Sequence, residues 1–458
     1  MSAEETLVNF VCGTRIEDIS SSALDTVKRQ VLTVVGTTIA GATAEGCKTA
    51  AEFYKKLEGK QEATILMYGG RVPAHDAAFV NGVMARALDF CDSMAPGPHP
   101  GSSVFPAALA AAELAGGCSG RDFISGVAVG TEVASRLNLS ETAYNGFDPT
   151  GICVPFGAAA ATARILGLGR KETWNALAMA FNSCGGSFQS HIDGSLGVRF
   201  VQGRVAQSGV ISARLASKGV SGPRHFLDGI YGYFHLYGKG LSAGEAALSH
   251  LGTRWGLLNM VFKKYPSCAL TAASTDLMLK LVAEEALNPD GVERIEITVP
   301  PYTHKLVGHP FAIGDNPKVN AQFSIQYCVA NALLRKASKL VHFEEETIRD
   351  SRIAALLKKI HVTPDRSLEA RGHTPLDMKV VVREGRELFR KIDIAPGFPG
   401  NELTAKDHEE RFWDCVDFAQ MPISRENAEK VMSVVETIES LKDIRSIIPL
   451  LIAREGHS

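Results

Sequence analysis

Two carboxylates, a hydroxyl and a histidine lie within eleven residues of the chain, between two alanine-rich segments. They belong to Asp89, Asp92, Ser93 and His99. Carboxylates and imidazoles transfer protons near neutral pH, and a stiff loop between packed helices holds such groups in fixed positions. Three prolines between positions 96 and 100 stiffen this loop, and the proline after His99 favours an extended backbone at the histidine. The stretch predicts an acid/base site. The alternative is that the carboxylates cap a helix end and His99 is an ordinary loop histidine.

The segment before this loop has helical apolar spacing, so we expect a helix from Val72 to Phe90. If residues 85–92 complete that helix, Asp89 and Asp92 are three positions apart and share one helix face. A new helix should begin near Val104.

Lys263 and Lys264 form a second group of chemically useful residues, just before Tyr265 and Pro266. A lysine shielded from water acts as a base when burial lowers its pKa, or stays charged and holds a substrate carboxylate. A solvated basic pair is the commoner arrangement for two adjacent lysines.

Arginines, a tyrosine and a polar loop supply further candidates. Arg199 and Arg204 suit carboxylate recognition because a guanidinium fork can bond both carboxylate oxygens, although exposed arginines without a ligand are equally common. Tyr327 lies in an apolar segment with helical spacing, where a core tyrosine with a bonded hydroxyl is the ordinary outcome. His191 and Asp193 form a compact polar loop among glycines, for which a substrate contact is one unspecific interpretation.

Several segments are similar to the motifs of one known family. The stretch 87–93 followed by His99 is similar to "ALDFDD" and "HPS/G", residues 263–268 to "KPYPSC", and residues 323–327 to "FSxxY". These motifs resemble those of the MmgE/PrpD family, which implies a small polycarboxylate as the substrate. In this order and spacing the matches are specific, and they run along most of the chain. The resemblance implies these site positions: Asp89, Ser93, His99, Lys263 and Tyr327.

Two positions depart from the family's pattern. Asp148 stands where the dehydratase and decarboxylase branches have a histidine in "GFHP", and Val198 stands where the decarboxylases have a lysine. The missing groups could protonate a departing hydroxyl or bind a departing carboxylate. Removal of a proton next to a carboxylate needs neither group. The resemblance with these departures therefore favours a cofactor-independent epimerase or racemase of a small di- or tricarboxylate, such as iminodisuccinate.

We predict that Lys263 and His99 transfer the protons, that Tyr144 is a further candidate for this role, and that Asp89 orients His99. The residues expected to bind substrate are Ser93, Asp148, Arg199, Arg204 and Tyr327. Two alternatives remain: a 2-methylcitrate dehydratase, and a non-catalytic family member that binds carboxylates or serves as a scaffold.

The composition is that of a soluble globular protein and disfavours several classes of function. The 458 residues are 45% apolar and 21% charged with a net charge of -2, so neither nucleic acid nor a membrane is expected as a partner. Nine cysteines without a CxxC pair favour reduced thiols in the cytoplasm. His304 and His309 are poorly spaced for a metal. The sequence also lacks a glycine-rich phosphate-binding loop and clustered cysteines, so we expect no cofactor and no metal.

The pattern changes near residue 268 and again near 396. The first part shows one helical segment after another, rich in small residues that let helices approach closely. Residues 268–395 combine helices with strand-like segments, of which the last two are joined by a turn at residues 384–386. We expect a mainly α protein. Residues 1–267 and 396–458 should form a large all-helical domain, with an inserted α+β lid domain at 268–395. The small-residue faces and the resemblance together predict a homodimer.

The helices expected from apolar spacing are residues 24–39, 72–90, 104–115, 121–137, 156–166, 170–182, 271–286, 320–335 and 345–358, with closing helices in 405–454. The expected strands are residues 291–300, 359–363, 378–383 and 387–394.

Overall fold

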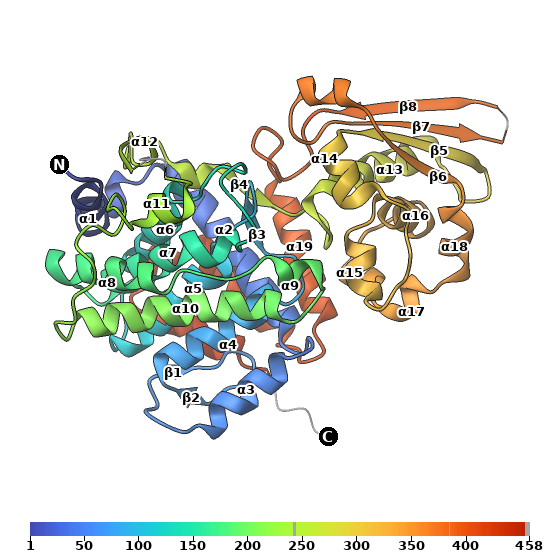
Figure 1. Ribbon diagram of the computed structural model, residues 1–458. Helices are drawn as coiled ribbons and strands as arrows, with labels where there is room; N and C mark the ends of the chain where they lie inside the picture. The colour runs from blue at the N-terminus through green and yellow to red at the C-terminus, as the bar shows by residue number, and fades with distance from the viewer. Residues whose placement is uncertain (241–243, 384, 454–458) are drawn as a thin grey trace. The chain divides into compact units, whose positions relative to one another are not determined.

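A computed structural model describes residues 1–240, 244–383 and 385–453, and the chain divides into two compact units (Figure 1). The first unit comprises Met1–Met260 together with the chain from Cys415 onward, and the second comprises Val261–Asp414. Most of the elements are helices, which confirms the prediction of a mainly α protein. Among the described residues, no helix is both long enough and apolar enough to cross a membrane.

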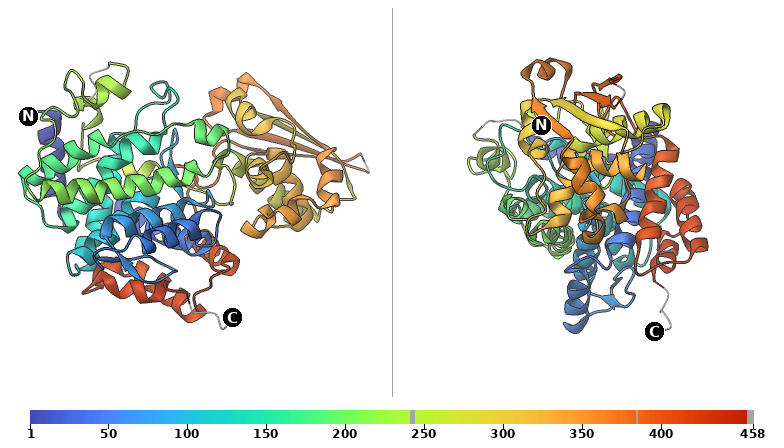
Figure 2. Two further views of the ribbon diagram at one scale, coloured as in Figure 1. Left: turned by 60° about the horizontal axis from the view of Figure 1, so that its bottom comes forward. Right: turned by 90° about the vertical axis from the view of Figure 1, so that its right-hand side faces the viewer.

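The first unit is a helical assembly with two very short strands at its edge. Its helices are α1 (Ala3–Gly13), α2 (Ser21–Gly41), α3 (Cys47–Lys56), α4 (Ala74–Arg86), α5 (Gly101–Leu114), α6 (Gly120–Arg136), α7 (Pro149–Ile165), α8 (Arg170–Asn182), α9 (Gln189–Ile192), α10 (Gly197–Ala216), α11 (Tyr233–Tyr237), α12 (Gly244–Ala247) and α20 (Arg425–Glu436). The strands β1 (Ala63–Thr64) and β2 (Arg71–Val72) pair with each other, and β3 (Asp92–Met94) lies in the candidate loop. Helix α20, red in Figure 2, packs against α2 from the other end of the chain.

Close helix crossings explain why this unit is rich in glycine and alanine. A Cβ atom built on Gly157 of α7 would lie 2.4 Å from the carbonyl oxygen of Gly130 in α6. A Cβ atom on Gly209 of α10 would lie 2.5 Å from the Cβ atom of Ala158 in α7. At these two crossings the helix backbones touch, so no larger residue fits without moving a helix.

The helix ends around the candidate loop differ from the prediction. Helix α4 ends at Arg86 because Asp89 has a φ angle of 52°, in the left-handed region, which a right-handed helix cannot include. Asp92 starts strand β3, so the prediction that Asp89 and Asp92 share a helix face is wrong. Helix α7 begins at Pro149, seven residues before the expected start, because Asp148 caps it and a proline suits the first helical position.

The second unit combines a four-stranded sheet with helices. Its strands in the sheet are β5 (Val292–Val299), β6 (Ile360–Pro364), β7 (Leu376–Val382) and β8 (Glu387–Ile392), in the order β6-β5-β7-β8. Its helices are α13 (Ala272–Glu285), α14 (Pro301–Thr303), α15 (Pro317–Gln322), α16 (Ile325–Arg335), α17 (Glu345–Ile348) and α18 (Ser351–Leu357). A π-helical turn covers His304–Gly308, and β4 (Met260–Phe262) and α19 (Ala405–Phe418) lie at the unit's boundaries.

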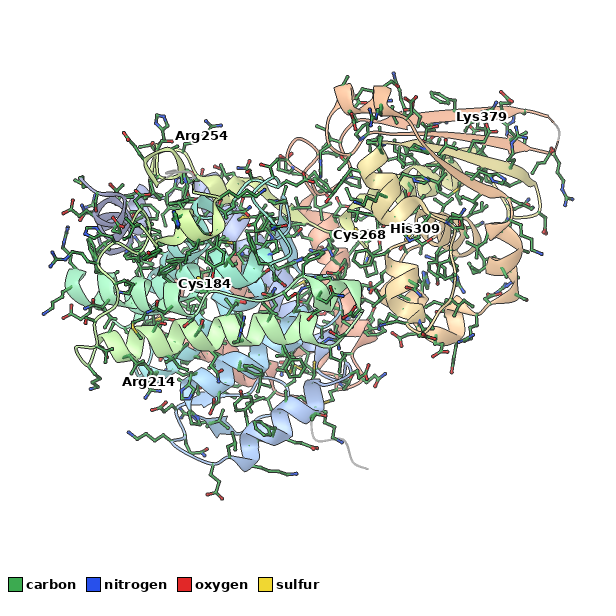
Figure 3. The ribbon with its side chains drawn as sticks, viewed as in Figure 1. Cys184, Arg214, Arg254, Cys268, His309 and Lys379 are labelled. Atoms are coloured by element: carbon green, nitrogen blue, oxygen red, sulfur yellow. The ribbon has the colours of Figure 1, made fainter. Side chains whose placement is uncertain are left out.

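The sheet buries one face, as the alternating sequence pattern predicts. Along β7 every second residue is buried, and α13 and α16 cover this face (Figure 1). On the other face Lys379, labelled in Figure 3, contacts Glu387 of β8 at 2.7 Å. The expected antiparallel hairpin of β7 and β8 is confirmed, and residue 384 of its expected turn lies outside the described residues.

The second unit is longer at both ends than the expected 268–395 segment. Phe262 donates its backbone N–H to the carbonyl of Gly397, and its ring meets the ring of His408 edge-on at 4.9 Å. Lys264 bonds Asp276 and approaches Asp407 at 3.4 Å. These contacts bring residues 261–267 and the first turns of α19 into the second unit.

Replacing Gly157 by alanine tests the crossing of α6 and α7. Alanine favours a helix by about 1 kcal/mol over glycine, but the clash with the Gly130 carbonyl should outweigh that gain. We expect Gly157→Ala to lower the free energy of unfolding by about 1–3 kcal/mol in chemical denaturation. The matched control is Gly13→Ala at the end of α1, where an added Cβ atom meets nothing within 4 Å and stability should not fall. Equal stability of the two variants would contradict a backbone contact at this crossing.

Candidate active site

The candidate loop is fastened to the helices by the fully buried side chain of Asp92. Its Oδ2 atom accepts a hydrogen bond from Gln30 of α2 at 3.1 Å and one from the backbone N–H of Gly101 at 2.9 Å. Gly101 is the first residue of α5, where a carboxylate also compensates the positive end of the helix dipole. Thr131 of α6 donates to the amide oxygen of Gln30 at 3.0 Å. Three helices therefore hold one carboxylate.

The main chain of Asp92 orients His99. The Nδ1 atom of His99 lies 2.7 Å from the carbonyl oxygen of Asp92, with the Cys91 sulfur at 3.4 Å. A carbonyl oxygen can only accept a hydrogen bond, so Nδ1 carries the proton and Nε2 is the basic nitrogen of the neutral ring. The backbone N–H of His99 donates to Thr150 Oγ1 at 3.0 Å, and the residue is only 9% exposed. His99 is thus fixed in one tautomer, which leaves Nε2 as the basic nitrogen of the neutral ring.

Asp89 forms an ion pair with Arg86. Arg86 Nη1 lies 2.5 Å from Asp89 Oδ1, and both side chains are largely buried. Burial alone would lower the pKa of Arg86, but the nearby carboxylates of Asp89 and Asp148 leave it raised, so the guanidinium stays charged. An aspartate tolerates the left-handed backbone of position 89 better than most residues. The contact that orients His99 comes from Asp92, and an orienting role for Asp89 stays a prediction.

Asp148 caps the start of α7. Its Oδ1 atom accepts hydrogen bonds from the backbone N–H groups of Thr150 at 2.8 Å and Gly151 at 3.4 Å. Its Oδ2 atom lies 3.9 Å from Nδ1 of His191. Cys184, labelled in Figure 3, donates to the carbonyl of Ile152 and holds the 184–186 segment against α7. The expected substrate-binding aspartate therefore has a structural task as well.

The two predicted arginines bond to backbone carbonyls. Arg199 Nη1 donates to Glu45 at 2.7 Å, and Arg204 Nη2 donates to Gly185 at 2.6 Å. Burial lowers the pKa of Arg199, although Cys47 beside it acts in the opposite direction. A guanidinium has five N–H groups, so these bonds leave donors for a carboxylate.

Tyr144 and Ser93 lie in the same unit. The Tyr144 hydroxyl donates to Asn138 Oδ1 at 2.8 Å, and burial raises its pKa well above the ordinary value. Burial thus disfavours the ionised phenolate, and an acid/base role of Tyr144 stays a prediction. Ser93 lies in β3 and is half-buried.

The second unit contains the other two predicted site residues, Lys263 and Tyr327. The adjacent residues Lys263 and Lys264 have different surroundings in this unit. Lys264 Nζ lies 3.0 Å from Asp276 Oδ1. Burial opposes the charge of Lys264, but the carboxylates of Asp276 and Asp407 outweigh burial and leave the pKa of Lys264 raised. Lys263 is only 5% exposed. Lys264 is therefore an ion-pair residue of the second unit, and a role of the buried Lys263 at the site stays a prediction.

Tyr327 lies fully buried in the core of the second unit. Its hydroxyl donates to the carbonyl of His342, and burial raises its pKa above the ordinary value. Its backbone N–H bonds to Ser324 Oγ at the start of α16. The ordinary alternative, a core tyrosine with a bonded hydroxyl, describes these contacts, and a role in substrate binding stays a prediction.

Within the part of the chain that the structure describes, no three histidine, cysteine, aspartate or glutamate side chains gather as a metal ion would require.

Sequence reasoning missed two features: the role of Gln30, and the proximity of His191 to Asp148. Neither has a signal in the sequence, since both depend on segments far apart along the chain.

Comparison with known proteins assigns the family. The model of the MmgE/PrpD N-terminal domain matches residues 5–245, and that of the MmgE/PrpD C-terminal domain matches residues 265–437. The chain belongs to the MmgE/PrpD family.

The relatives that align with nearly the whole chain are named after one reaction, the decarboxylation of cis-aconitate. Cis-aconitate decarboxylase from Homo sapiens is 26% identical, over 98% of this chain and 94% of the relative. The enzyme of the same name from Mus musculus is 25% identical, over 98% of this chain and 93% of the relative. A cis-aconitate decarboxylase-like protein from Aspergillus oryzae is 22% identical, over 97% of this chain and 96% of the relative. These relatives support a lyase-type enzyme. They do not support the epimerase that the sequence departures favoured.

Replacing Asp92 by alanine tests the anchor of the candidate loop. The change leaves Gln30 and the start of α5 without their buried acceptor, so we expect the free energy of unfolding to fall by about 2–4 kcal/mol. The matched control is Ser119→Ala, which removes the exposed cap of α6 and should cost about 1 kcal/mol. Equal losses of the free energy of unfolding for the two variants in urea denaturation would show that the burial of Asp92 adds nothing to stability.

Proposed function

We propose that this MmgE/PrpD protein is a lyase that acts on a small polycarboxylate, with proton transfer through its own side chains. The observation that carries the proposal is the fixed orientation of His99, which presents a single basic nitrogen in a buried, rigid loop. The full-length similarity to proteins named cis-aconitate decarboxylase supports the lyase class.

The proposed chemistry needs a positioned acid/base group and cations. In decarboxylation, the C–C bond to a carboxylate breaks, the electron pair remains on the substrate, and a proton is delivered to carbon. In dehydration, a proton next to a carboxylate is removed, and a β-hydroxyl leaves as water once it is protonated. Both reactions also need charged groups that bind the remaining carboxylates and the developing negative charge.

We assign these roles to individual residues of the candidate set. His99 Nε2 exchanges the proton with the substrate. Lys263 either exchanges a second proton or holds a carboxylate, and its burial suits both tasks. Arg199 and Arg204 hold carboxylates, and Ser93 and Tyr327 contribute hydrogen bonds.

Epimerisation is the second candidate. The observation that favours it is the pair of departures from the family pattern, Asp148 in place of a histidine and Val198 in place of a lysine. An epimerase removes a proton next to a carboxylate and returns a proton to the opposite face, without loss of carbon dioxide or water.

Three assays on the purified protein separate the candidates. We expect carbon dioxide release from cis-aconitate, or alkene formation from citrate or 2-methylcitrate. Inversion of a resolved polycarboxylate in deuterium oxide, with solvent deuterium at the α-carbon and neither lyase product, would make the protein an epimerase. Thermal stabilisation by these polycarboxylates without any turnover would instead indicate a carboxylate-binding family member.

The adjacent lysines offer a matched pair of variants. Lys263→Met should lower kcat/KM at least 100-fold, because it removes a shielded cation or base at small cost in volume. Lys264→Met should leave kcat/KM within a few-fold and lower the free energy of unfolding by about 1–3 kcal/mol, because Asp276 loses its charged partner. A rise in KM with unchanged kcat in Lys263→Met would identify Lys263 as a carboxylate anchor. Full activity of that variant would remove Lys263 from the site.

We also propose that the protein is a homodimer. Sedimentation at micromolar concentration should give twice the mass of one chain. A single chain at that concentration would contradict this proposal.

A further inference from the structure

We propose that Asp148 and His191 form a second acid/base pair of the site, in which His191 delivers a proton and Asp148 supports its charge. This proposal rests on the proposed lyase function and names an additional residue for it. Both side chains belong to the first unit, and neither position had an acid/base role in the sequence-based assignment.

The carboxylate of Asp148 divides its two oxygens between two tasks. Oδ1 accepts the backbone hydrogen bonds of the first turn of α7, and Oδ2 faces His191 Nδ1 at 3.9 Å. The Asp148 side chain is only 3% exposed, and the His191 side chain is 21% exposed. A buried carboxylate at this distance favours the protonated imidazole, while the partial exposure of the ring keeps it accessible to a small molecule.

The ring of His191 has a defined orientation. It stacks on the ring of Phe188 with a centroid distance of 4.3 Å and an interplanar angle of 6°. The backbone N–H of Phe188 donates to Gly146 at 2.8 Å, and that of Asp148 donates to Gly186 at 3.0 Å. The segments 146–148 and 186–188 thus pair as a short antiparallel bridge, which fixes the imidazole opposite the carboxylate.

The first turn of α7 connects this pair with His99. Thr150 accepts the backbone N–H of His99 through its hydroxyl and donates its own N–H to Asp148. Both imidazoles are therefore tied to the same helix end, His99 through Thr150 and His191 through the Asp148 carboxylate. The charged Arg86 interacts with both Asp89 and Asp148 and adds positive charge to the cluster.

The proton balance of the proposed step is simple. The N–H bond of protonated His191 breaks, and the proton forms a C–H bond on the carbanion left by decarboxylation, or an O–H bond on a departing hydroxyl. His191 becomes neutral and takes its next proton from solvent. Asp148 itself transfers no proton in this step and continues to cap α7.

Chemical rescue of a deleted imidazole tests this role. His191→Ala should lower kcat about 100-fold or more with little change in KM, and added imidazole should restore part of the rate. Substituted imidazoles of different pKa should rescue to different extents, which a merely structural ring would not show. Asp148→Asn keeps an oxygen that can cap α7 but removes the charge, and should lower kcat about 10-fold.

The chain provides a matched control pair. His75 Nε2 lies 3.4 Å from Asp76 Oδ1, with side chains 30% and 11% exposed, and His75→Ala should keep the wild-type rate. Unchanged kcat in His191→Ala, or a loss that no imidazole rescues, would overturn the proposal.

A second measurement separates this proposal from the lyase assignment. Histidine NMR spectra of the wild type and of Asp148→Asn report the pKa of His191 without any substrate. We expect the pKa to fall by about 1 unit in the variant, which corresponds to loss of one close charge. No change would overturn the pair even if the protein is an active lyase. A clear shift in a protein without lyase turnover would contradict the proposed function and leave the charge pair standing.

Discussion

The buried carboxylate of Asp92 is the interaction on which the candidate site depends. In place of water, the carboxylate accepts hydrogen bonds from the side-chain amide of Gln30 and from the first backbone N–H of α5. These bonds avoid the large free-energy cost of a buried charge without donors. The same residue accepts the Nδ1 proton of His99 through its carbonyl group. Side chain and main chain of one residue therefore join three helices to one imidazole.

This arrangement explains how a proline-rich loop can hold an imidazole in one orientation. The loop lies between α4 and α5, and its histidine also bonds to the start of α7 through Thr150. The helices that carry these anchors are packed at backbone contact through glycine and alanine, so they leave little room for movement. Rigid support of this kind is what a proton-transfer group requires, because small displacements cost large factors in rate.

The sequence predicts the regular elements well and the special positions poorly. The apolar periodicity identifies α2, α6, α8 and α13 almost to their ends, and the alternation identifies β5 and the hairpin of β7 and β8. It fails at Asp89, because a left-handed residue that is paired with Arg86 depends on tertiary contacts. Only the family motif distinguishes Lys263 from Lys264 in the sequence, since the ion pairs of Lys264 with Asp276 and Asp407 depend on the fold. The family motifs give the residue types of the site, whereas the tautomer of His99 and the approach of His191 to Asp148 require the fold. The preference for an epimerase came from single-residue departures from the family motifs, and such departures do not show that His191 lies near Asp148.

The tautomer of His99 tests the central claim most directly. Long-range proton–nitrogen NMR spectra of the histidine-labelled protein, assigned with a His99→Gln variant, distinguish a protonated Nδ1 from a protonated Nε2. The hydrogen bond to the Asp92 carbonyl predicts that the neutral ring carries its proton on Nδ1 and leaves Nε2 basic. A neutral ring with its proton on Nε2 would contradict the account, because Nε2 could then not accept a proton from the substrate.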